Sequence, residues 1–557
     1  MEKSTSPTPS TSSSSSTSNH QSFGKKINND EPSNLNSNSN SNPVKNCHLI
    51  VLTHGLWGTS DHFNYLEKSL NSYLLKHYPN ECFFIFKTIS NEKFKTYDGI
   101  DICGTRVADE ILIKTNHLNN NGYKIIKFSI IGYSLGGLIA RFAIGILNFK
   151  NYFNFIIPIN FITFCSPHVG VLTPGNSLTI KLFNNFVPYL LGNSGKQIFL
   201  KDKTNGNLPL LNLMSIENSI FFKTLKKFKY ISLYSNIRSD IRTSYWTSAI
   251  SFINPFEILD KNQNVIIDNN GFINFANGSK FQLSFLNDYN PIILDVSKNI
   301  NFNGLIDYDK EINYKSKDKN KYKDKINNNN NNFIQRKFKW LILIFNTFIY
   351  IPMWIIWFII YNILQSFQSF IRVTREYSKL KDNISIYNLI ESNINTPLIK
   401  PAYSNEFNKF ENDLHDQGDL FLDSVFDAIT SSNNINKSIF NQNSFGGNNS
   451  LITNLNELCS IPINDIKNWE FDYKIINNDK LIAFKYYQIL KSFKLNISNY
   501  QIDIIKNLNK LNWSKFPIYI TNTNSTHAAA IVRHDDPSFD QGKIVIQHFC
   551  EKTFKIN

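Results

Sequence analysis

Short apolar runs, separated by polar or glycine-containing stretches, recur along the chain and predict buried strands. The clearest runs are residues 47–53 (CHLIVLT), 124–131 (KIIKFSII), 229–235 (KYISLYS) and 517–521 (PIYIT). Residues 137–143 (GLIARFA), which closely follow the second run, instead predict a helix. The pattern favours an α/β fold, because short buried strands and helices share the chain.

The sequence GYSLG at residues 132–136 joins the second apolar run to the predicted helix. A strand, a G-x-S-x-G turn and a helix in this order form the nucleophile elbow, whose sharp turn pushes the serine side chain out of the sheet. Gly132 and Gly136 relieve the crowding that such a turn causes. The helix N-terminus stabilises a developing negative charge. Ser134 is therefore the candidate nucleophile.

The first apolar run leads directly into HGLWG at residues 54–58, in which Gly55 is the loop glycine. Acyl-transfer enzymes aim backbone N–H groups at the oxyanion of the tetrahedral intermediate, and each donor is worth about 10²–10³ in rate. One donor belongs to the residue after the serine, and the other to a loop after an early strand. We expect Leu135 and Leu56 to supply them. The simpler alternative is that residues 54–58 form only a turn.

The other two catalytic groups should follow in the order acid, then histidine. Asp240 stands in a loop shortly after the third apolar run, where the acid belongs. His527 follows the fourth run and a polar loop, and it is the candidate base. His534 and His548 are the alternatives for the base, since both lie in the same stretch of sequence.

These residues and several other blocks resemble the putative serine esterases, a lipase-like family of the α/β-hydrolase superfamily. The resemblance covers roughly residues 46–250 and 505–550, in the order of the family. Its blocks are LTHGLWG at 52–58, YDGIDICG at 97–104, the elbow through Arg141, FCSPHVGV at 164–171, the stretch 233–240, TSAI at 247–250 and HAAAIVR at 527–533. The resemblance implies an α/β-hydrolase fold, with a mostly parallel sheet flanked by helices, and a triad on the candidate serine, acid and histidine. One departure is Tyr133, where such lipases commonly carry histidine.

The candidate residues imply ester hydrolysis through an acyl-enzyme, with His527 as base, Asp240 orienting it, and no cofactor. No metal is expected, because the six cysteines form no C-x-x-C pair and no His/Asp cluster has the spacing of metal ligands. Asp61 and His62 could line the pocket. We interpret them instead as a helix start, with Ser60 or Asp61 as N-cap.

The triad candidates extend from Ser134 to His527, which predicts one hydrolase domain with long insertions in the 557 residues. The Ser/Asn-rich start of the chain predicts disorder and lacks the apolar stretch of a signal peptide. The predicted parts are a disordered N-terminus at 1–45, the first part of the hydrolase core at 46–255, an insertion at 256–337, an apolar segment at 338–372, a second insertion at 373–504 and the last part of the core at 505–557.

Residues 340–364 form the longest apolar run, with 25 residues and no charge. About 20 apolar residues suffice to cross a bilayer, but a single crossing would separate His527 from Ser134 and Asp240. Pro352 lies near the middle of the run and should break a helix into halves that are too short to cross. We therefore expect a hairpin that enters and leaves a lipid surface, with an apolar lid over the active site as the alternative.

The net charge of +14 fits contact with a lipid surface, because basic residues at 315–339 and 372–381 flank the apolar run. Basic flanks beside an apolar segment favour binding to anionic lipid headgroups and a location on the cytoplasmic face. We expect no nucleic-acid partner. Scattered cysteines fit a reducing compartment. We expect a lipid ester substrate at the cytoplasmic face of the endoplasmic reticulum or a lipid droplet, and no secretion. The alternatives are an acyl-protein thioesterase and a non-catalytic, membrane-tethered scaffold.

Overall fold

The computed structural model describes most of the predicted hydrolase core and parts of the insertions. The described residues are 44–256 apart from 176, 205–207 and 241; 259; 266–267; 272–274; 280–301 apart from 298; 351–380; 452–454; and 495–557. The predicted disordered N-terminus, up to residue 43, and most of the second insertion lie outside them.

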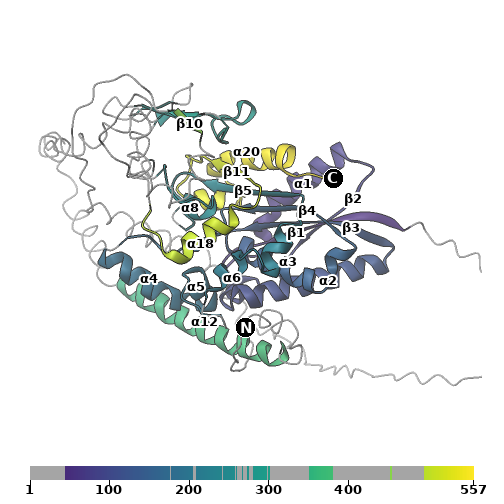
Figure 1. Ribbon diagram of the computed structural model, residues 1–557, viewed down its shortest axis with the longest axis horizontal. Helices are drawn as coiled ribbons and strands as arrows, with labels where there is room; N and C mark the ends of the chain where they lie inside the picture. Colours follow the sequence, from purple (N-terminus) through teal and green to yellow (C-terminus); the bar gives the residue numbers. More distant parts are fainter. Residues whose placement is uncertain are drawn as a thin grey trace, which may run out of the picture. The chain divides into compact units, whose positions relative to one another are not determined.

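Six parallel strands of the described chain form a central sheet in the spatial order β11-β5-β4-β3-β1-β2 (Figure 1). Their bounds are β1 Lys45–Thr53, β2 Cys82–Lys87, β3 Tyr123–Tyr133, β4 Ile157–Phe164, β5 Tyr230–Asn236 and β11 Trp513–Ile518. The last seven residues of β1 are all buried, as expected for a strand that is covered on both faces. β11 pairs with β5, so a distant part of the chain completes the sheet.

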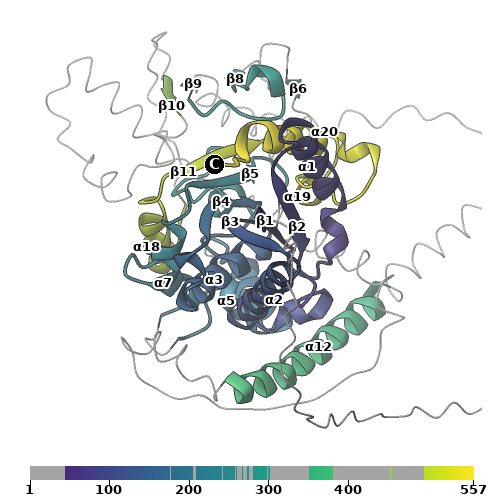
Figure 2. The same cartoon turned by 90° about the vertical axis from the view of Figure 1, so that its right-hand side faces the viewer.

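Helices cover both faces of the sheet, and each face has its own apolar core (Figures 1 and 2). Successive side chains of a strand point to opposite faces of the sheet, so each strand can contribute to both cores. The helices are α1 Asn64–His77, α2 Ile100–Asn120, α3 Leu135–Phe149, α4 Leu178–Leu190, α5 Gly192–Ile198, α6 Leu210–Ser215, α7 Ile220–Leu225, α8 Tyr245–Ser248, α12 Ile351–Leu380, α18 Asn499–Leu508, α19 Thr526–Ala529 and α20 Asp540–His548. The predicted α/β class, with a parallel sheet flanked by helices, is confirmed.

Shorter elements complete the described structure. A second, antiparallel sheet has the order β10-β9-β8-β7-β6. Its strands are β6 Ile266–Ile267, β7 Phe272–Asn274, β8 Lys280–Gln282, β9 Asn299–Asn301 and β10 Ile452–Asn454. The 3₁₀ turns are η1 Ser60–Phe63, η2 Lys93–Tyr97, η3 Tyr152–Asn154, η4 Asn287–Tyr289 and η7 Pro537–Phe539, and η8 Phe549–Thr553 is a π-helix.

Two predicted boundaries differ from the structure. The fourth apolar run was predicted as a strand over 517–521, but β11 begins at Trp513 and ends at Ile518. The helix start at Ser60 is correct, but its N-cap is Thr59, whose side chain makes no capping hydrogen bond. A 3₁₀ turn comes first there, and α1 follows from Asn64.

The apolar segment predicted at 338–372 overlaps α12, which the structure describes from Ile351 onward. Pro352 is the second described residue of this helix, and the half of the run before it lies outside the described residues, so the break expected at Pro352 stays a prediction. The helix then continues without interruption to Leu380, through the basic residues that were predicted to flank the segment. Within the described residues, no helix has both the length and the apolar character that a bilayer crossing needs. The first part of the run, 340–350, lies outside the described residues.

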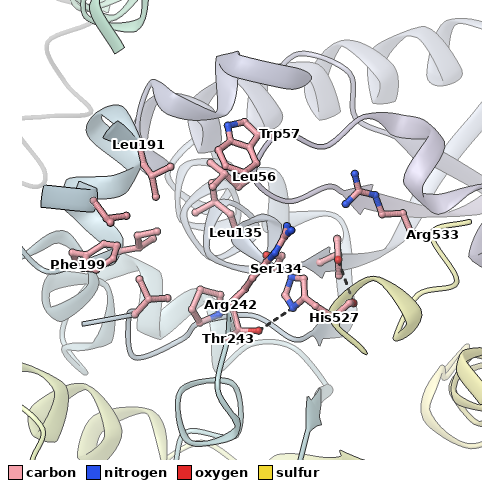
Figure 3. A pocket seen from close by; sticks show the side chains of 15 residues that line it. Leu56, Trp57, Ser134, Leu135, Leu191, Phe199, Arg242, Thr243, His527 and Arg533 are labelled. Atoms are coloured by element: carbon pink, nitrogen blue, oxygen red, sulfur yellow. Dashed lines mark hydrogen bonds between the residues drawn. The ribbon is translucent and has the colours of Figure 1, made fainter. Parts of the chain in front are cut away.

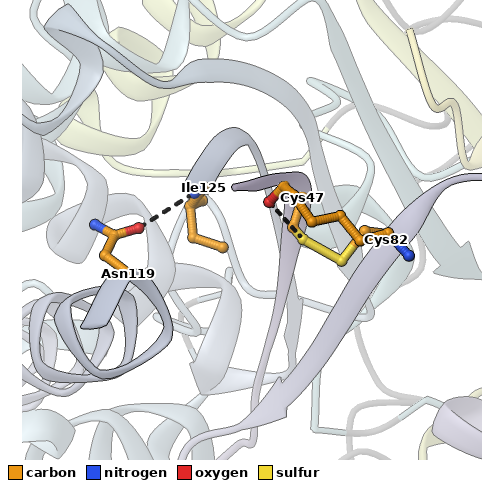
Figure 4. Close-up of a disulfide and its surroundings, with 5 residues drawn as sticks. Cys47, Cys82, Asn119 and Ile125 are labelled. Carbon is orange, nitrogen blue, oxygen red and sulfur yellow. Dashed lines mark hydrogen bonds between the residues drawn. A yellow bond between two sulfur atoms is a disulfide. The ribbon is translucent and has the colours of Figure 1, made fainter. Parts of the chain in front are cut away.

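Cys47 of β1 and Cys82 of β2 form a disulfide, with their Cα atoms 4.6 Å apart (Figure 4). They are register partners in the parallel ladder of these two strands. The interpretation of all six cysteines as scattered thiols is therefore wrong for this pair, and it no longer favours a reducing compartment. The three other cysteines in the described part of the chain, Cys103, Cys165 and Cys550, are free and buried.

Candidate active site

Ser134 stands between β3 and α3, at the turn where the sequence predicted a nucleophile elbow. Its backbone has φ +54° and ψ −128°, a strained conformation for a residue with a side chain. Its N–H donates a hydrogen bond of 2.9 Å to the carbonyl oxygen of Phe164 in the neighbouring strand. Leu135 is the first residue of α3, so its N–H belongs to the helix N-terminus. The sharp turn carries Ser134 out of the sheet and into a pocket.

The predicted glycines allow residues 54–58, which we call the oxyanion loop, to lie against the elbow. A Cβ atom on Gly136 would lie 2.0 Å from a backbone oxygen at the end of β1. A Cβ atom on Gly55 would lie 2.7 Å from the Cβ atom of Ser134, and one on Gly132 would lie 2.4 Å from the backbone of α3. Side chains at Gly55 and Gly136 would therefore force the oxyanion loop and the elbow apart, and one at Gly132 would disrupt the turn of the elbow itself.

Asp240 and His527 lie side by side, although 287 residues separate them in the sequence. Asp240 follows β5, and His527 lies in the short helix α19. The Nδ1 atom of His527 is 2.9 Å from Oδ2 and 3.1 Å from Oδ1 of Asp240. Only 9% of the His527 side chain and 1% of the Asp240 side chain are exposed. The pair thus has the geometry of a carboxylate that orients an imidazole.

Thr243 and Asn236 complete the hydrogen bonds of the Asp240 carboxylate. The N–H of Thr243 donates to Oδ1 at 2.9 Å, its hydroxyl donates to Oδ2 at 3.1 Å, and the amide of Asn236 donates to Oδ2 at 3.0 Å. Burial alone would raise the pKa of Asp240, but His527 and these donors outweigh burial and lower the pKa. Asp240 is therefore ionised at neutral pH.

The two alternative histidines have other surroundings. The Nδ1 atom of His548 is 2.7 Å from the hydroxyl of Tyr234, and burial lowers the pKa of His548 to about 4. His534 packs its ring against Phe539, with 5.8 Å between the ring centroids. Of the three candidate bases, His527 is the one that the structure brings to Asp240.

Ser134 and His527 line the same pocket, and their side chains are neighbours in Figure 3. Its apolar lining consists of Leu56, Trp57, Leu135, Pro167, Val171, Val187, Leu191, Ile198 and Phe199, and Tyr133, Arg242, Thr243 and Arg533 complete it. Leu56 and Leu135, the residues predicted to supply the oxyanion donors, both line the pocket. In Figure 3, Leu191 and Phe199 lie on one side of Ser134 and Arg533 on the opposite side.

Asp61 and His62 lie in η1, as the helix-start interpretation predicted, and not among the described lining residues. His62 stands behind one of those lining residues, because the Nε atom of Arg533 lies 2.9 Å from its Nε2 atom. The contact of His62 with the site is therefore indirect.

One group within the described residues has the spacing of metal ligands. Donor atoms of Cys165, Asp240 and His527 lie within 4.8 Å of one another. A metal would need the thiolate of Cys165, whereas burial raises the pKa of this thiol well above its ordinary value. The donor set therefore suits a hydrogen-bonded acid–base pair better than a metal centre.

Comparison with known proteins agrees with the chemistry of this site. Residues 43–250 match the family described as putative serine esterase (DUF676). The predicted family is confirmed for this part of the chain. The match contains Ser134 and Asp240 and ends before His527.

Proteins similar to this chain include several from fungi. The putative lipase ROG1 of Saccharomyces cerevisiae is 32% identical over 224 residues, which are 40% of this chain and 31% of the relative. The putative lipase C4A8.10 of Schizosaccharomyces pombe is 26% identical over 214 residues, which are 37% of this chain and 26% of the relative. The chain spans between a fifth and a third of the length of the curated relatives that it matches.

Solved structures similar to this chain include two bacterial proteins. Phospholipase PlaB from Legionella pneumophila has a TM-score of 0.22 and 15% identity, and the similarity covers 37% of this chain and 43% of that protein. A lipase-esterase related protein from Clostridium acetobutylicum has a TM-score of 0.21 and 14% identity, and the similarity covers 39% of this chain and 82% of that protein.

The motifs shared with the serine esterases did not point to Thr243, Asn236 or the role of Tyr133. The Tyr133 hydroxyl donates to the carbonyl oxygen of His527 at 3.2 Å, and the two ring centroids are 5.0 Å apart. Thr243 lies only three residues after Asp240, but no motif in the sequence marks it as a partner of the carboxylate. The contact between Tyr133 and His527 spans 394 residues and had no local signal.

Proposed function

We propose that this chain is a serine-dependent carboxylic ester hydrolase that acts on lipids, as a phospholipase or an acylglycerol lipase. The observation that carries the proposal is the hydrogen-bonded Asp240–His527 pair in the pocket that Ser134 lines. A nucleophile, a base and an orienting carboxylate are the parts that acyl transfer through a covalent intermediate requires.

Asp240 keeps the Nδ1 atom of His527 protonated, so the Nε2 atom accepts the proton of the Ser134 hydroxyl. The Oγ atom of Ser134 attacks the ester carbonyl carbon and forms a tetrahedral intermediate. When the bond to the alcohol breaks, His527 returns the proton to the leaving alcohol and the acyl group stays on Ser134. A water that His527 deprotonates then attacks the acyl carbon. As the bond between this carbon and Oγ breaks, His527 returns the proton to Oγ of Ser134 and the fatty acid is released.

The negative charge of the tetrahedral intermediate falls on the former carbonyl oxygen. The backbone N–H groups of Leu56 and Leu135 are proposed to stabilise it, because they belong to the oxyanion loop and to the start of α3. Donors that are already in place reorganise little during the reaction, which is the source of their catalytic effect.

The apolar lining of the pocket supports a substrate with an acyl chain. Burial of apolar surface contributes about 25 cal/mol per Å², so a long chain in contact with Val187, Leu191 and Phe199 binds favourably. Lipid esters are therefore the proposed substrates. An acyl-protein thioester, the alternative within the same chemistry, would place its acyl chain in the same pocket.

We further propose that the enzyme works at a lipid surface, that of the endoplasmic reticulum or of a lipid droplet, with α12 in contact with the lipid. The support for this is the exposed apolar side of α12, which includes Ile356, Ile360, Leu364 and Phe367. Large exposed apolar patches mark interaction or membrane sites.

The test compares purified wild type with Ser134→Ala on phospholipid, monoacylglycerol and triacylglycerol emulsions, a short-chain chromogenic ester and a palmitoyl thioester peptide. We expect fatty-acid release by the wild type and a fall of at least 10³-fold in the variant. Hydrolysis of the thioester peptide alone would favour the thioesterase. Absence of hydrolysis in both folded proteins would refute the enzyme and favour the scaffold.

A further inference from the structure

The oxyanion loop rests on η2 through its own backbone. The N–H of Trp57 donates to the hydroxyl of Thr96 at 3.1 Å, and the N–H of Lys93 donates to the carbonyl oxygen of Gly58 at 2.9 Å. The Trp57 and Tyr97 rings pack with 6.2 Å between their centroids. Trp57 has φ +53°, which is strained for a large side chain, so the surrounding contacts must hold this conformation.

The 3₁₀ turn η2 is in turn held by α12, which packs against it. The Tyr97 hydroxyl donates to Oδ1 of Asn362 at 2.6 Å in a buried contact. The rings of Phe94 and Tyr361 meet edge to face at 5.4 Å. A guanidinium nitrogen of Arg372 donates to the carbonyl oxygen of Phe94 at 3.0 Å.

A buried ion cluster strengthens the same junction. Asp98, the residue that follows η2, has a fully buried side chain. Arg372 of α12 binds its carboxylate with Nε and a terminal nitrogen, at 2.9–3.2 Å, and Arg106 of α2 binds Oδ2 at 2.7 Å. Glu376, one turn after Arg372, accepts two further hydrogen bonds from Arg106 at 2.8 and 3.0 Å. A buried carboxylate needs such partners, because removing one leaves an uncompensated charge.

We propose that α12 is a positioning element of the oxyanion hole: Asn362 and Arg372 hold η2, and η2 holds the N–H of Leu56 at the pocket. This inference rests on the proposed function. The helix comes from an insertion far along the chain, yet through η2 its contacts reach Trp57, which is the residue after Leu56 in the oxyanion loop. Because an oxyanion donor acts on the transition state, loss of this support lowers kcat more than it raises KM.

The test is a double-mutant cycle on hydrolysis of a short-chain ester, with Tyr97→Phe, Asn362→Leu and the double variant. We expect each single change to lower kcat about three- to tenfold with KM within twofold, since part of one donor's 10²–10³ is lost. The kcat of the double variant should equal that of the less active single variant, because both changes remove the same hydrogen bond. Ser366→Ala is the control: it lies on the same helix and bonds the carbonyl oxygen of Leu190 instead.

Hydrogen–deuterium exchange of the peptide that contains residues 54–58 gives a readout that needs no activity. Exchange should be faster in Asn362→Leu and in Arg372→Met than in wild type, and unchanged in Ser366→Ala. The proposal would be overturned if the single variants kept the full kcat, or if the losses of kcat multiplied in the double variant. It would also be overturned if residues 54–58 exchanged in Asn362→Leu and Arg372→Met at the wild-type rate. A wild type without esterase activity would refute the proposed function, and the exchange rates would still decide whether α12 holds the loop.

Discussion

Asp240 depends on its neighbours more than any other side chain of the candidate triad. Its carboxylate orients the imidazole of His527 at 2.9 Å, and because an ionised carboxylate can only accept hydrogen bonds, it selects the tautomer with a proton on Nδ1. Asp240→Asn keeps the shape but can donate to Nδ1 and select the other tautomer. We therefore expect kcat to fall about 10³–10⁴-fold, as in serine proteases with this change. Steady-state kinetics on a soluble ester, with circular dichroism to verify folding, measures this.

Thr243 offers a graded comparison at the same carboxylate. Thr243→Val removes the hydroxyl bonds to Asp240 and His527 but keeps the backbone N–H bond. We expect a smaller loss of kcat, about tenfold, which corresponds to one hydrogen bond to a charged group. A loss as large as that of Asp240→Asn would show that Thr243 does more than support the carboxylate.

The lowered pKa of His548 makes the stability of the folded protein depend on pH. Burial and the nearby Lys552 lower its pKa to about 4 in the folded protein, whereas an unfolded histidine titrates near 6.5. Between these values the unfolded chain binds the proton and the folded chain does not, so stability is complete above pH 6.5 and falls as the pH drops towards 4. The loss from this residue between pH 7 and pH 5 is about 2 kcal/mol.

Urea unfolding at pH 7 and pH 5, of wild type and of His548→Gln, measures this contribution. The glutamine has no titration in this range, so the variant should lose less stability on acidification than the wild type. An equal pH dependence in the two proteins would contradict the assignment.

Local motifs made part of the site predictable. Ser134 and Gly136 are identifiable because the elbow is a continuous piece of chain between a strand and a helix. Asp240 and His527 could be proposed from chain order, but their contact depends on how β5 and β11 pair. Arg533 belongs to a block that resembles the family, but its place in the pocket lining could not be predicted from the sequence, since the lining is assembled only when the chain folds.

Strands and helices were predictable in type and less so in extent. β3 extends to Tyr133, two residues beyond its apolar run, because β4 continues to pair with it there. β11 begins at Trp513, although the polar Ser514 and Lys515 interrupt the apolar pattern, since its backbone is paired with β5. Helix α12 continues beyond the uncharged run because Arg372 and Glu376 find partners in the core, which hydropathy alone does not reveal.

The junction of β1 and β2 carries a testable covalent link. Replacing both Cys47 and Cys82 by serine removes a bridge across 35 residues. We expect stability to fall by up to about 4 kcal/mol, the chain-entropy value for a loop of this length. Urea unfolding of the variant and of wild type measures this. Peptide mass spectrometry without reduction should show the linked peptides, and alkylation of both thiols in the native protein would contradict the pairing.

Exposed large apolar side chains of the described chain concentrate on two adjacent helices, α4 and α12, which pack against each other (Figure 1). On α4 they are Leu178, Leu182, Phe186 and Tyr189, and on α12 they are Met353, Ile356, Trp357, Ile360, Ile363, Leu364, Phe367 and Phe370. The other side of α4 carries Val187, which lines the pocket. The proposed lipid contact would thus lie beside the wall of the proposed active site.

This arrangement predicts that lipid binding depends on both helices. Phe186 and Phe367 are 53% and 60% exposed, and each phenylalanine that enters lipid contributes about 1.5–3 kcal/mol. Phe186→Asp with Phe367→Asp should therefore weaken flotation with phosphatidylcholine–phosphatidylserine vesicles by at least tenfold. The ratio of vesicle-lipid hydrolysis to soluble-ester hydrolysis should fall with it. Phe155→Asp, at a phenylalanine that is 87% exposed outside α4 and α12, is the matched control. Equal vesicle binding by all three proteins would show that this apolar surface serves another partner.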